Sequence, residues 1–235
     1  MPYGFGGFYF MDYWYIVLVI PAMIIAMIAQ FKVKSNYNKF SKVLNSRGIT
    51  GAYAAQTILS FYGITDVRIE QVSGQLTDHY DPKAKVIRLS QGVYSASSIA
   101  AVGIACHEAG HAAQHAESYL PIKIRTSLVP VCNIGSHLGI PLALLGLFLN
   151  VQPLVIFGLV LYGAVFLFHL VTLPVEFNAS RRAIKVIEET NLLYDDEVNG
   201  AKKVLASAAM TYVASMLVAL ASLLRLVLRF NRRRN

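Results

Sequence analysis

The sequence of 235 residues is too apolar for an ordinary soluble protein, because its mean hydropathy is +0.50 and only 14% of its residues are charged. Its net charge of +8 comes from basic residues at the edges of apolar runs, without a nucleic-acid-binding motif. We therefore expect anionic lipid headgroups, and not nucleic acids, to meet this charge. The two cysteines, Cys106 and Cys132, are not expected to pair in a reducing compartment.

The first uncharged run extends from Tyr13 to Phe31, and about 20 residues are enough to cross a bilayer. Nothing basic precedes it and no small-residue cleavage site follows, so we expect a retained span rather than a signal peptide. Aromatic residues typical of the membrane interface stand at its start, namely Tyr9, Tyr13, Trp14 and Tyr15. Its end is followed by Lys32, Lys34, Lys39 and Lys42. The positive-inside rule predicts that this end is cytoplasmic and that the N-terminus lies outside.

Residues 32–125 are expected to form a small domain outside the membrane. Residues 52–61 predict a helix, and alternation of side chains over residues 66–72 predicts a half-buried strand. Asp-Pro-Lys-Ala at 81–84 predicts a turn, and residues 85–89 predict a second strand. We therefore expect one helix and a small antiparallel sheet before the next helix.

That next helix carries the most informative motif of the chain, His-Glu-Ala-Gly-His at residues 107–111, within an apolar, alanine-rich run. Residues four apart lie on one face of a helix, so His107 and His111 can direct their imidazoles at one point, with Glu108 beside them. Two such imidazoles are typical zinc ligands, and the adjacent carboxylate can take a proton from water. The serines before the helix, Ser95, Ser97 and Ser98, are candidate N-caps.

Two other interpretations of these histidines remain: satisfied core residues, or a structural metal site. We favour a catalytic metal, because a polar His-Glu-His triplet is costly to bury without a partner. His115 shares the same face but lies a further turn away, about 5–6 Å along the axis. We therefore expect His115 to support a ligand or to pack rather than to bind the metal.

A catalytic zinc usually has three protein ligands, and Glu176 is the best candidate for the third. Pro174 is well placed for the first turn of a new helix, on which Glu176, Ala179 and Ala183 share a face. The two alanines would let this helix approach the motif helix closely. Taken alone, Glu176 is better explained as a carboxylate favoured near a helix N-terminus.

Residues 126–175 contain no charge across fifty positions, which is enough for two spans at about 130–149 and 154–173, with a turn at 150–153. Two crossings return the chain to the side that it left. Glu176 is therefore expected on the same side of the membrane as His107.

A fourth uncharged run covers residues 204–224. Four crossings would put the basic residues after it outside, against the positive-inside rule; these are Arg225, Arg229, Arg232, Arg233 and Arg234. The alternative is an amphipathic helix in the membrane interface. We favour a span because of the uncharged length.

The motif at 107–111, together with Glu-Phe-Asn-Ala-Ser-Arg-Arg-Ala at 176–183, resembles the YugP-like membrane zinc metallopeptidases. The resemblance extends through residues 76–82 and 86–90 and covers most of the chain. More distantly, the chain resembles the HtpX and CAAX-prenyl-protease class of membrane gluzincins. The resemblance implies that His107, His111 and Glu176 are zinc ligands and that Glu108 is the catalytic base.

In one respect the sequence departs from the distant class. Members of that class carry an aspartate four residues after the ligand glutamate, where this chain has Ser180. A hydroxyl is a weaker acceptor than a carboxylate for orienting a ligand histidine, so the sequence leaves that orientation open.

A peptidase also needs a hydrogen-bond donor for the developing oxyanion besides the metal. His79, Tyr80, Arg181 and Arg182 are the candidates. Each is equally explained by loop hydrogen bonds or ion pairs, and the sequence does not choose among them.

The fold class predicted from these features is an α-helical integral membrane protein with a small α+β gluzincin-like metallopeptidase domain. In that fold, an edge strand above the motif helix binds the substrate backbone. The expected parts are an N-terminal transmembrane helix (1–31), a cytoplasmic catalytic domain (32–125), a transmembrane hairpin (126–173), a cytoplasmic helix with the third ligand (174–203), and a C-terminal transmembrane or interfacial helix with a basic tail (204–235).

The predicted function is that of a multi-pass, cell-membrane zinc metalloendopeptidase with its active site on the cytoplasmic side. Its expected partners are a polypeptide substrate and the lipid bilayer; the sequence specifies neither the substrate nor the oligomeric state. One alternative is a membrane scaffold with a metal site and little turnover, although Glu108 would then have no task. A transporter that uses His137 and His169 is the weakest interpretation, because no internal repeats accompany them.

Overall fold

The computed structural model describes residues 12–234, which divide into two compact units. The helical unit contains residues up to 29, residues 124–173 and residues from 211 onward; the mixed unit contains residues 30–123 and 174–210. Tyr9, one of the predicted interfacial aromatic residues, lies outside the described part of the chain.

Four helices are long and apolar enough to cross a membrane: Tyr15–Phe40, Leu120–Leu149, Gln152–Glu189 and Asp195–Arg232. The first consists of a π-helical turn η1 (Tyr15–Val19) and α1 (Ile20–Phe40); the others are α5 (Leu120–Leu149), α6 (Gln152–Glu189) and α7 (Asp195–Arg234). The prediction of four candidate spans is confirmed in length and composition.

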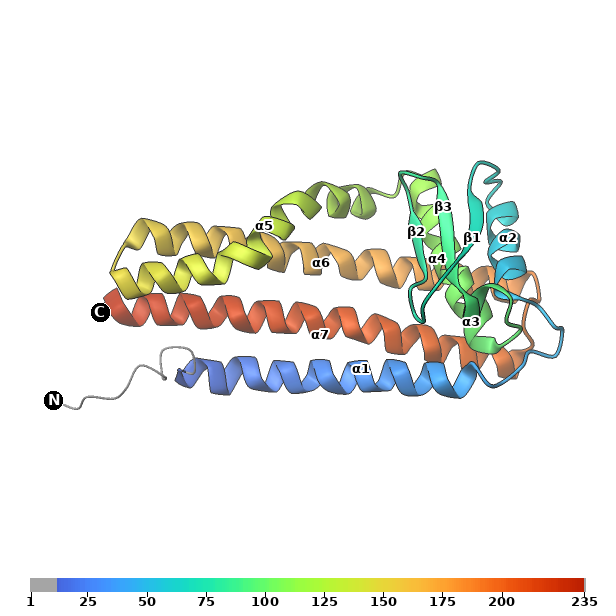
Figure 1. The fold of residues 1–235 in the computed structure, drawn as a ribbon, viewed down its shortest axis with the longest axis horizontal. Coiled ribbons are helices and arrows are strands. Elements are labelled where there is room, and N and C mark those ends of the chain that lie inside the picture. The colour runs from blue at the N-terminus through green and yellow to red at the C-terminus, as the bar shows by residue number, and fades with distance from the viewer. Residues whose placement is uncertain (1–11, 235) are drawn as a thin grey trace. The chain divides into compact units, whose positions relative to one another are not determined.

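Within the helical unit, α5 and the first part of α6 form an antiparallel pair joined at residues 150–151 (Figure 1). The pair is packed through glycines. A Cβ atom on Gly146 would lie 2.6 Å from the backbone nitrogen of Val155, and one on Gly158 would lie 2.5 Å from that of Ala143. Glycine is therefore required for this approach, as in many membrane helix pairs. The predicted turn is found at Asn150, whose φ of 58° lies in the left-handed region.

A cluster of charges in the helical unit joins the beginning of its first helix to the end of its last. Asp12 accepts hydrogen bonds from Nε of Arg225 at 3.0 Å and from a terminal nitrogen of Arg229 at 3.1 Å. The guanidinium of Arg225 also lies 4.7 Å from the ring centroid of Tyr15. Two of the arginines that conflict with the positive-inside rule are thus paired with a carboxylate. This contact puts the end of the last helix beside the start of the first.

The sheet of the mixed unit has three strands, β1 (Arg68–Val72), β2 (His79–Asp81) and β3 (Val86–Ser90), in the order β1-β3-β2. β2 pairs with β3 in antiparallel fashion across the predicted turn, but β1 runs parallel to β3. The sequence predicted only two strands, at residues 66–72 and 85–89, in an antiparallel sheet. That prediction was therefore wrong. The reason is that β2 adds one more reversal of the chain between β1 and β3. The carboxylate of Asp78 accepts hydrogen bonds from the backbone N–H and the hydroxyl of Ser90 and so anchors the segment before β2 beside the end of β3.

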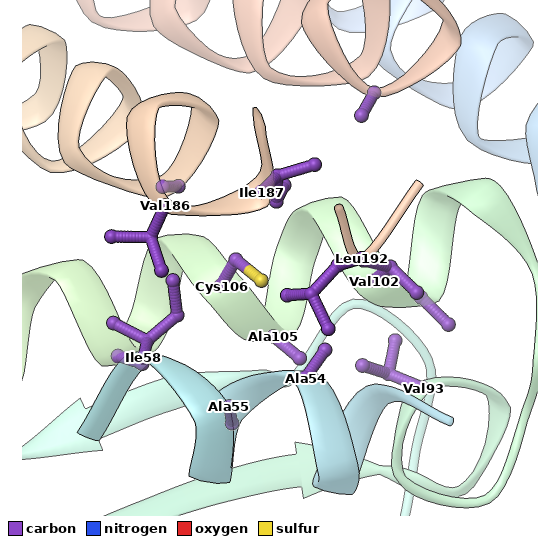
Figure 2. Packing of buried hydrophobic residues seen from close by; sticks show 14 of the residues in the cluster. Ala54, Ala55, Ile58, Val93, Val102, Ala105, Cys106, Val186, Ile187 and Leu192 are labelled. Atoms are coloured by element: carbon purple, nitrogen blue, oxygen red, sulfur yellow. The ribbon is translucent and has the colours of Figure 1, made fainter. Parts of the chain in front are cut away.

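The helices of the mixed unit surround one apolar core (Figure 2). They are α2 (Gly51–Phe61), α3 (Gln91–Tyr94) and α4 (Ile99–Ala116), with the last parts of α1 and α6 and the first part of α7. The Ser98 hydroxyl caps α4 by accepting from the Ala101 N–H, as predicted. Ile58 of α2, Cys106 of α4 and Ile187 of α6 are fully buried in this core, which fixes α4 in place.

Both cysteines are free thiols, and Cys106 is a buried core residue, as expected. Burial raises the pKa of the Cys106 thiol far above its usual value, so it stays protonated beside His107.

Helix α6 differs from the prediction at Pro174. The expected helix start is wrong, because α6 continues through Pro174 from Gln152 to Glu189. Proline removes one helical hydrogen bond, but apolar helices tolerate this loss when side chains satisfy nearby carbonyl groups. A nearby hydroxyl, that of Thr172, donates to the carbonyl of Phe168 at 2.7 Å, a different carbonyl from the one that loses its N–H partner at Pro174. The third predicted span and Glu176 consequently belong to one helix.

Candidate metal centre

The candidate site lies where α4 meets the part of α6 that belongs to the mixed unit. The Nε2 atoms of His107 and His111 lie 3.3 Å and 3.6 Å from the same carboxylate oxygen of Glu176. The two imidazole ring centroids are 4.7 Å apart, and the Glu176 side chain is only 2% exposed. The three residues that the sequence singled out as ligands are therefore within reach of one ion.

The spacing of these atoms can be tested against zinc. Nitrogen and oxygen ligands lie about 2.0–2.1 Å from a tetrahedral zinc ion, so two such ligand atoms are about 3.3 Å apart. The observed 3.3 Å and 3.6 Å agree with this geometry. Two imidazoles and one carboxylate are also a ligand set of catalytic zinc, which keeps a fourth position for water or substrate. Within the described range 12–234, this is the one cluster of three or more His, Cys, Asp or Glu residues at metal-binding spacing.

The close approach of the two helices depends on Gly110, in the middle of the motif. A Cβ atom on Gly110 would lie 2.7 Å from the backbone oxygen of Ala179 on α6. Real Cβ atoms do not approach backbone oxygens so closely, so any side chain here would push α6 away. Ala179 and Ala183 are fully buried, in keeping with the small residues expected on the face that carries Glu176.

Each histidine has a second partner at its other ring nitrogen. The Ser180 hydroxyl lies 3.0 Å from Nδ1 of His107, so a hydroxyl takes the place that an aspartate has in the distant class. The Gln114 side-chain oxygen lies 3.0 Å from Nδ1 of His111. Sequence reasoning missed Gln114 as a partner of His111. The available signal was its position three residues after His111, as a polar residue on an otherwise alanine-rich helix.

The site attracts positive charge. Burial disfavours protonation of His111, but the hydrogen bond and charge of Glu176, with the charge of Glu108, outweigh burial and raise the pKa of His111. The same electrostatic environment that favours a proton on the imidazole favours a metal cation in its place.

Comparisons with known proteins show the family of the chain. Residues 15–231 match a family described as "putative neutral zinc metallopeptidase". The chain belongs to this family. It is also 48% identical over 216 residues, 92% of this chain and 96% of the relative, to the "putative membrane protease YugP" of Bacillus subtilis strain 168. No solved structure matches the chain significantly. The resemblance noted from the motifs is thus confirmed for this zinc metallopeptidase family.

The remaining residues singled out from the sequence lie around the three-residue cluster. Glu108 follows His107 on α4 and is half-buried. His115 is not among the clustered ligand atoms; its ring packs against Tyr80 of β2 with centroids 5.6 Å apart, in line with a packing role.

Two of the candidate oxyanion donors already have strong partners. Nδ1 of His79 lies 2.8 Å from the carbonyl oxygen of Thr77. Arg182 forms an ion pair with Glu117 at 2.6 Å. Arg181 instead lines a groove of about 580 Å³ between α6 and α7, together with Ser180.

Proposed function

We propose that the protein is an integral-membrane zinc metalloendopeptidase that hydrolyses peptide bonds of membrane-associated or misfolded polypeptides. The observation that carries the proposal is the convergence of His107, His111 and Glu176 at distances of 3.3 Å and 3.6 Å, in a chain of a zinc metallopeptidase family. Residues 32–125 and 174–203 then form a gluzincin-like catalytic domain around α4.

The residues divide the chemistry between them. His107, His111 and Glu176 would hold the ion, which when bound acts as a Lewis acid that polarises a carbonyl group and makes water more acidic. Glu108 accepts the proton of the attacking water and later delivers it to the leaving amine nitrogen. Because Glu108 adjoins a ligand without being one, its loss would stop catalysis and spare the ion.

The substrate backbone would bind along β2. This strand is an edge of the sheet in the order β1-β3-β2, and it packs against α4. An extended polypeptide can extend such an edge by backbone hydrogen bonds and so place its scissile bond beside the motif helix. The second oxyanion donor is expected among His79 and Tyr80 of β2 and Arg181 and Arg182 of α6.

The catalytic domain would face the cytoplasm. Four lysines follow the first apolar run, which favours a cytoplasmic position for what comes next. The α5–α6 pair returns the chain to the same side, and Glu176 follows the last apolar stretch of α6 directly. Cleavage is therefore expected close to the membrane surface, within reach of polypeptides that are themselves anchored there.

The variant Glu108→Gln separates the enzyme from a metal-binding scaffold. It keeps the shape of the side chain and removes the base, so peptide hydrolysis should fall by about 10²–10⁴-fold while zinc and fold are retained. The measurement compares cleavage of an unstructured, membrane-tethered peptide by both proteins at equal zinc content. Equal rates, or no zinc-dependent cleavage by the wild type across a broad set of peptides, would favour the scaffold.

A further inference from the structure

The side chain of Gln114 is fully buried and connects the two helices that carry the candidate ligands. Its amide nitrogen donates to the backbone oxygen of Val175 at 2.8 Å and to the side-chain oxygen of Asn178 at 2.9 Å. Both acceptors are carbonyl oxygens, which cannot donate. The amide nitrogen of Gln114 must therefore face α6, and its oxygen must face His111.

The orientation of Asn178 is fixed in the same way. Nε of Arg182, which can only donate, lies 2.8 Å from the Asn178 side-chain oxygen. That oxygen thus accepts from Arg182 and from Gln114 at once. The far end of the Arg182 guanidinium is held by the carboxylate of Glu117, the residue at the C-terminal end of α4. The chain of hydrogen bonds leaves α4, crosses α6 and returns to α4.

The donor-to-acceptor direction of these hydrogen bonds determines the tautomer of His111. The Gln114 oxygen only accepts, so Nδ1 of His111 must carry a hydrogen. In the neutral imidazole, the form that binds a metal, Nε2 is then the nitrogen with the free lone pair, and it faces Glu176. We propose that Gln114 and Asn178 are positioning residues that lock His111 in its metal-binding tautomer and hold α4 against α6. The proposal rests on the proposed zinc site.

The other ligand histidine, His107, has a partner that does not select its tautomer. His107 contacts the Ser180 hydroxyl at 3.0 Å, and a hydroxyl both donates and accepts, so it is compatible with either tautomer of His107. The two histidines are therefore constrained to different degrees. Gln114 also bonds to Val175, the neighbour of Glu176, so it sets the position of two ligands on two helices together.

Two amide-to-carboxylate changes test the donor-to-acceptor direction of these hydrogen bonds. Asn178→Asp keeps an acceptor where Arg182 and Gln114 donate, so zinc affinity should stay within about twofold of the wild type. Gln114→Glu places a carboxylate oxygen against the oxygens of Val175 and Asn178, so zinc affinity should fall by about 10–100-fold, the usual cost of losing a partner of a ligand histidine. A general effect of negative charge near the metal would instead strengthen zinc binding in both variants.

The experiment measures zinc affinity by competition with a chelator in detergent, and the visible absorption of the cobalt(II)-substituted proteins as a report on ligand geometry. Gln114→Glu should change the cobalt spectrum and Asn178→Asp should not. If Gln114→Glu does not fold, Asn178→Leu takes its place, because it removes the acceptor and should weaken zinc binding relative to Asn178→Asp.

Equal affinities and equal cobalt spectra in the compared variants would overturn the positioning role and leave the proposed function intact. Failure of the wild type itself to bind zinc would overturn the proposed function, and the positioning role with it. The two failures are thus distinguishable without a peptidase assay.

Discussion

The helical unit and the mixed unit bury their side chains by different means. In the helical unit, glycines such as Gly146 and Gly158 bring α5 and α6 into backbone contact, and a charge cluster forms around Asp12. In the mixed unit, an apolar core lies beside polar side chains that are hydrogen-bonded in a fixed order, from Arg182 through Asn178 to the buried Gln114.

This difference indicates which changes each unit tolerates. The α5–α6 pair depends on side-chain volume, so an added methyl group is harmful there while many apolar exchanges of similar size are not. The candidate metal centre depends on donor and acceptor identity, so even an isosteric exchange is harmful when it reverses a hydrogen bond. The predictions that follow test both kinds of dependence, and the changes at Asp12 and Gly110 extend each kind to the other unit.

The largest expected effect is all-or-none and concerns topology. Single cysteines introduced near Asp81 and near Asn199, in a chain from which Cys106 and Cys132 have been removed, should react with a membrane-impermeant reagent from the same side. The α5–α6 pair requires this, because two crossings return the chain to its starting side. Labelling from opposite sides would refute both the pair of spans and the shared metal site.

Removal of the carboxylate at Asp12 should destabilise the helical unit and leave the metal centre unchanged. The Arg225 side chain is only 6% exposed, and loss of one partner of a buried pair typically costs about 3–5 kcal/mol. Asp12→Ala should therefore lower the thermal unfolding temperature in detergent without changing zinc affinity. Asp66→Ala is the matched control, because it removes an exposed pair with Lys85. Equal destabilisation by the two changes would contradict the account.

Gly110→Ala should affect the metal centre directly. The new Cβ would lie 2.7 Å from the backbone oxygen of Ala179, so α6 must move and carry Glu176 with it. We expect a loss of about 1–3 kcal/mol in stability, as for other overpacked sites, and clearly weaker zinc binding. Gly163→Ala, where a Cβ meets nothing within 4 Å, should change neither quantity. Unchanged zinc affinity in Gly110→Ala would show that helix contact does not position the third ligand.

The smallest expected effect concerns Glu117, at the outer end of the hydrogen-bond chain. The hydrogen bond from Arg182 lowers the pKa of Glu117 below its ordinary value of 4.5. A carboxyl group whose pKa is lowered on folding stabilises the folded state at pH values above its ordinary pKa. This contribution is lost as the pH falls through the lowered pKa. Because the carboxylate is half exposed, Glu117→Gln should cost at most about 1 kcal/mol at neutral pH and nothing in strong acid. A pH-independent cost in thermal unfolding would contradict this.

The parts of the fold that follow from regular spacing were predictable from the sequence. His111 is four positions after His107, and a helix puts the two on one face whatever surrounds it. The uncharged runs likewise predicted four long helices, since their length depends on the bilayer and not on tertiary contacts.

The parts that depend on tertiary contacts were not predictable in the same way. Residues 79–81 form a strand because β3 and Asp78 hold them, and three residues carry too little pattern to indicate it. Pro174 suggested a helix start, but the apolar helix continues through it. The role of Gln114 depends on Asn178, 64 positions away, and no local pattern connects the two.

The central claim is that His107, His111 and Glu176 hold one zinc ion, and X-ray absorption at the zinc edge of the purified protein tests it most directly. We expect about one zinc per chain, with two imidazole nitrogens and a carboxylate oxygen at about 2.0–2.1 Å. Glu176→Ala should lose zinc to the same extent as His107→Ala. Sulfur in the zinc shell at about 2.3 Å, or an unchanged shell in Glu176→Ala, would contradict the account.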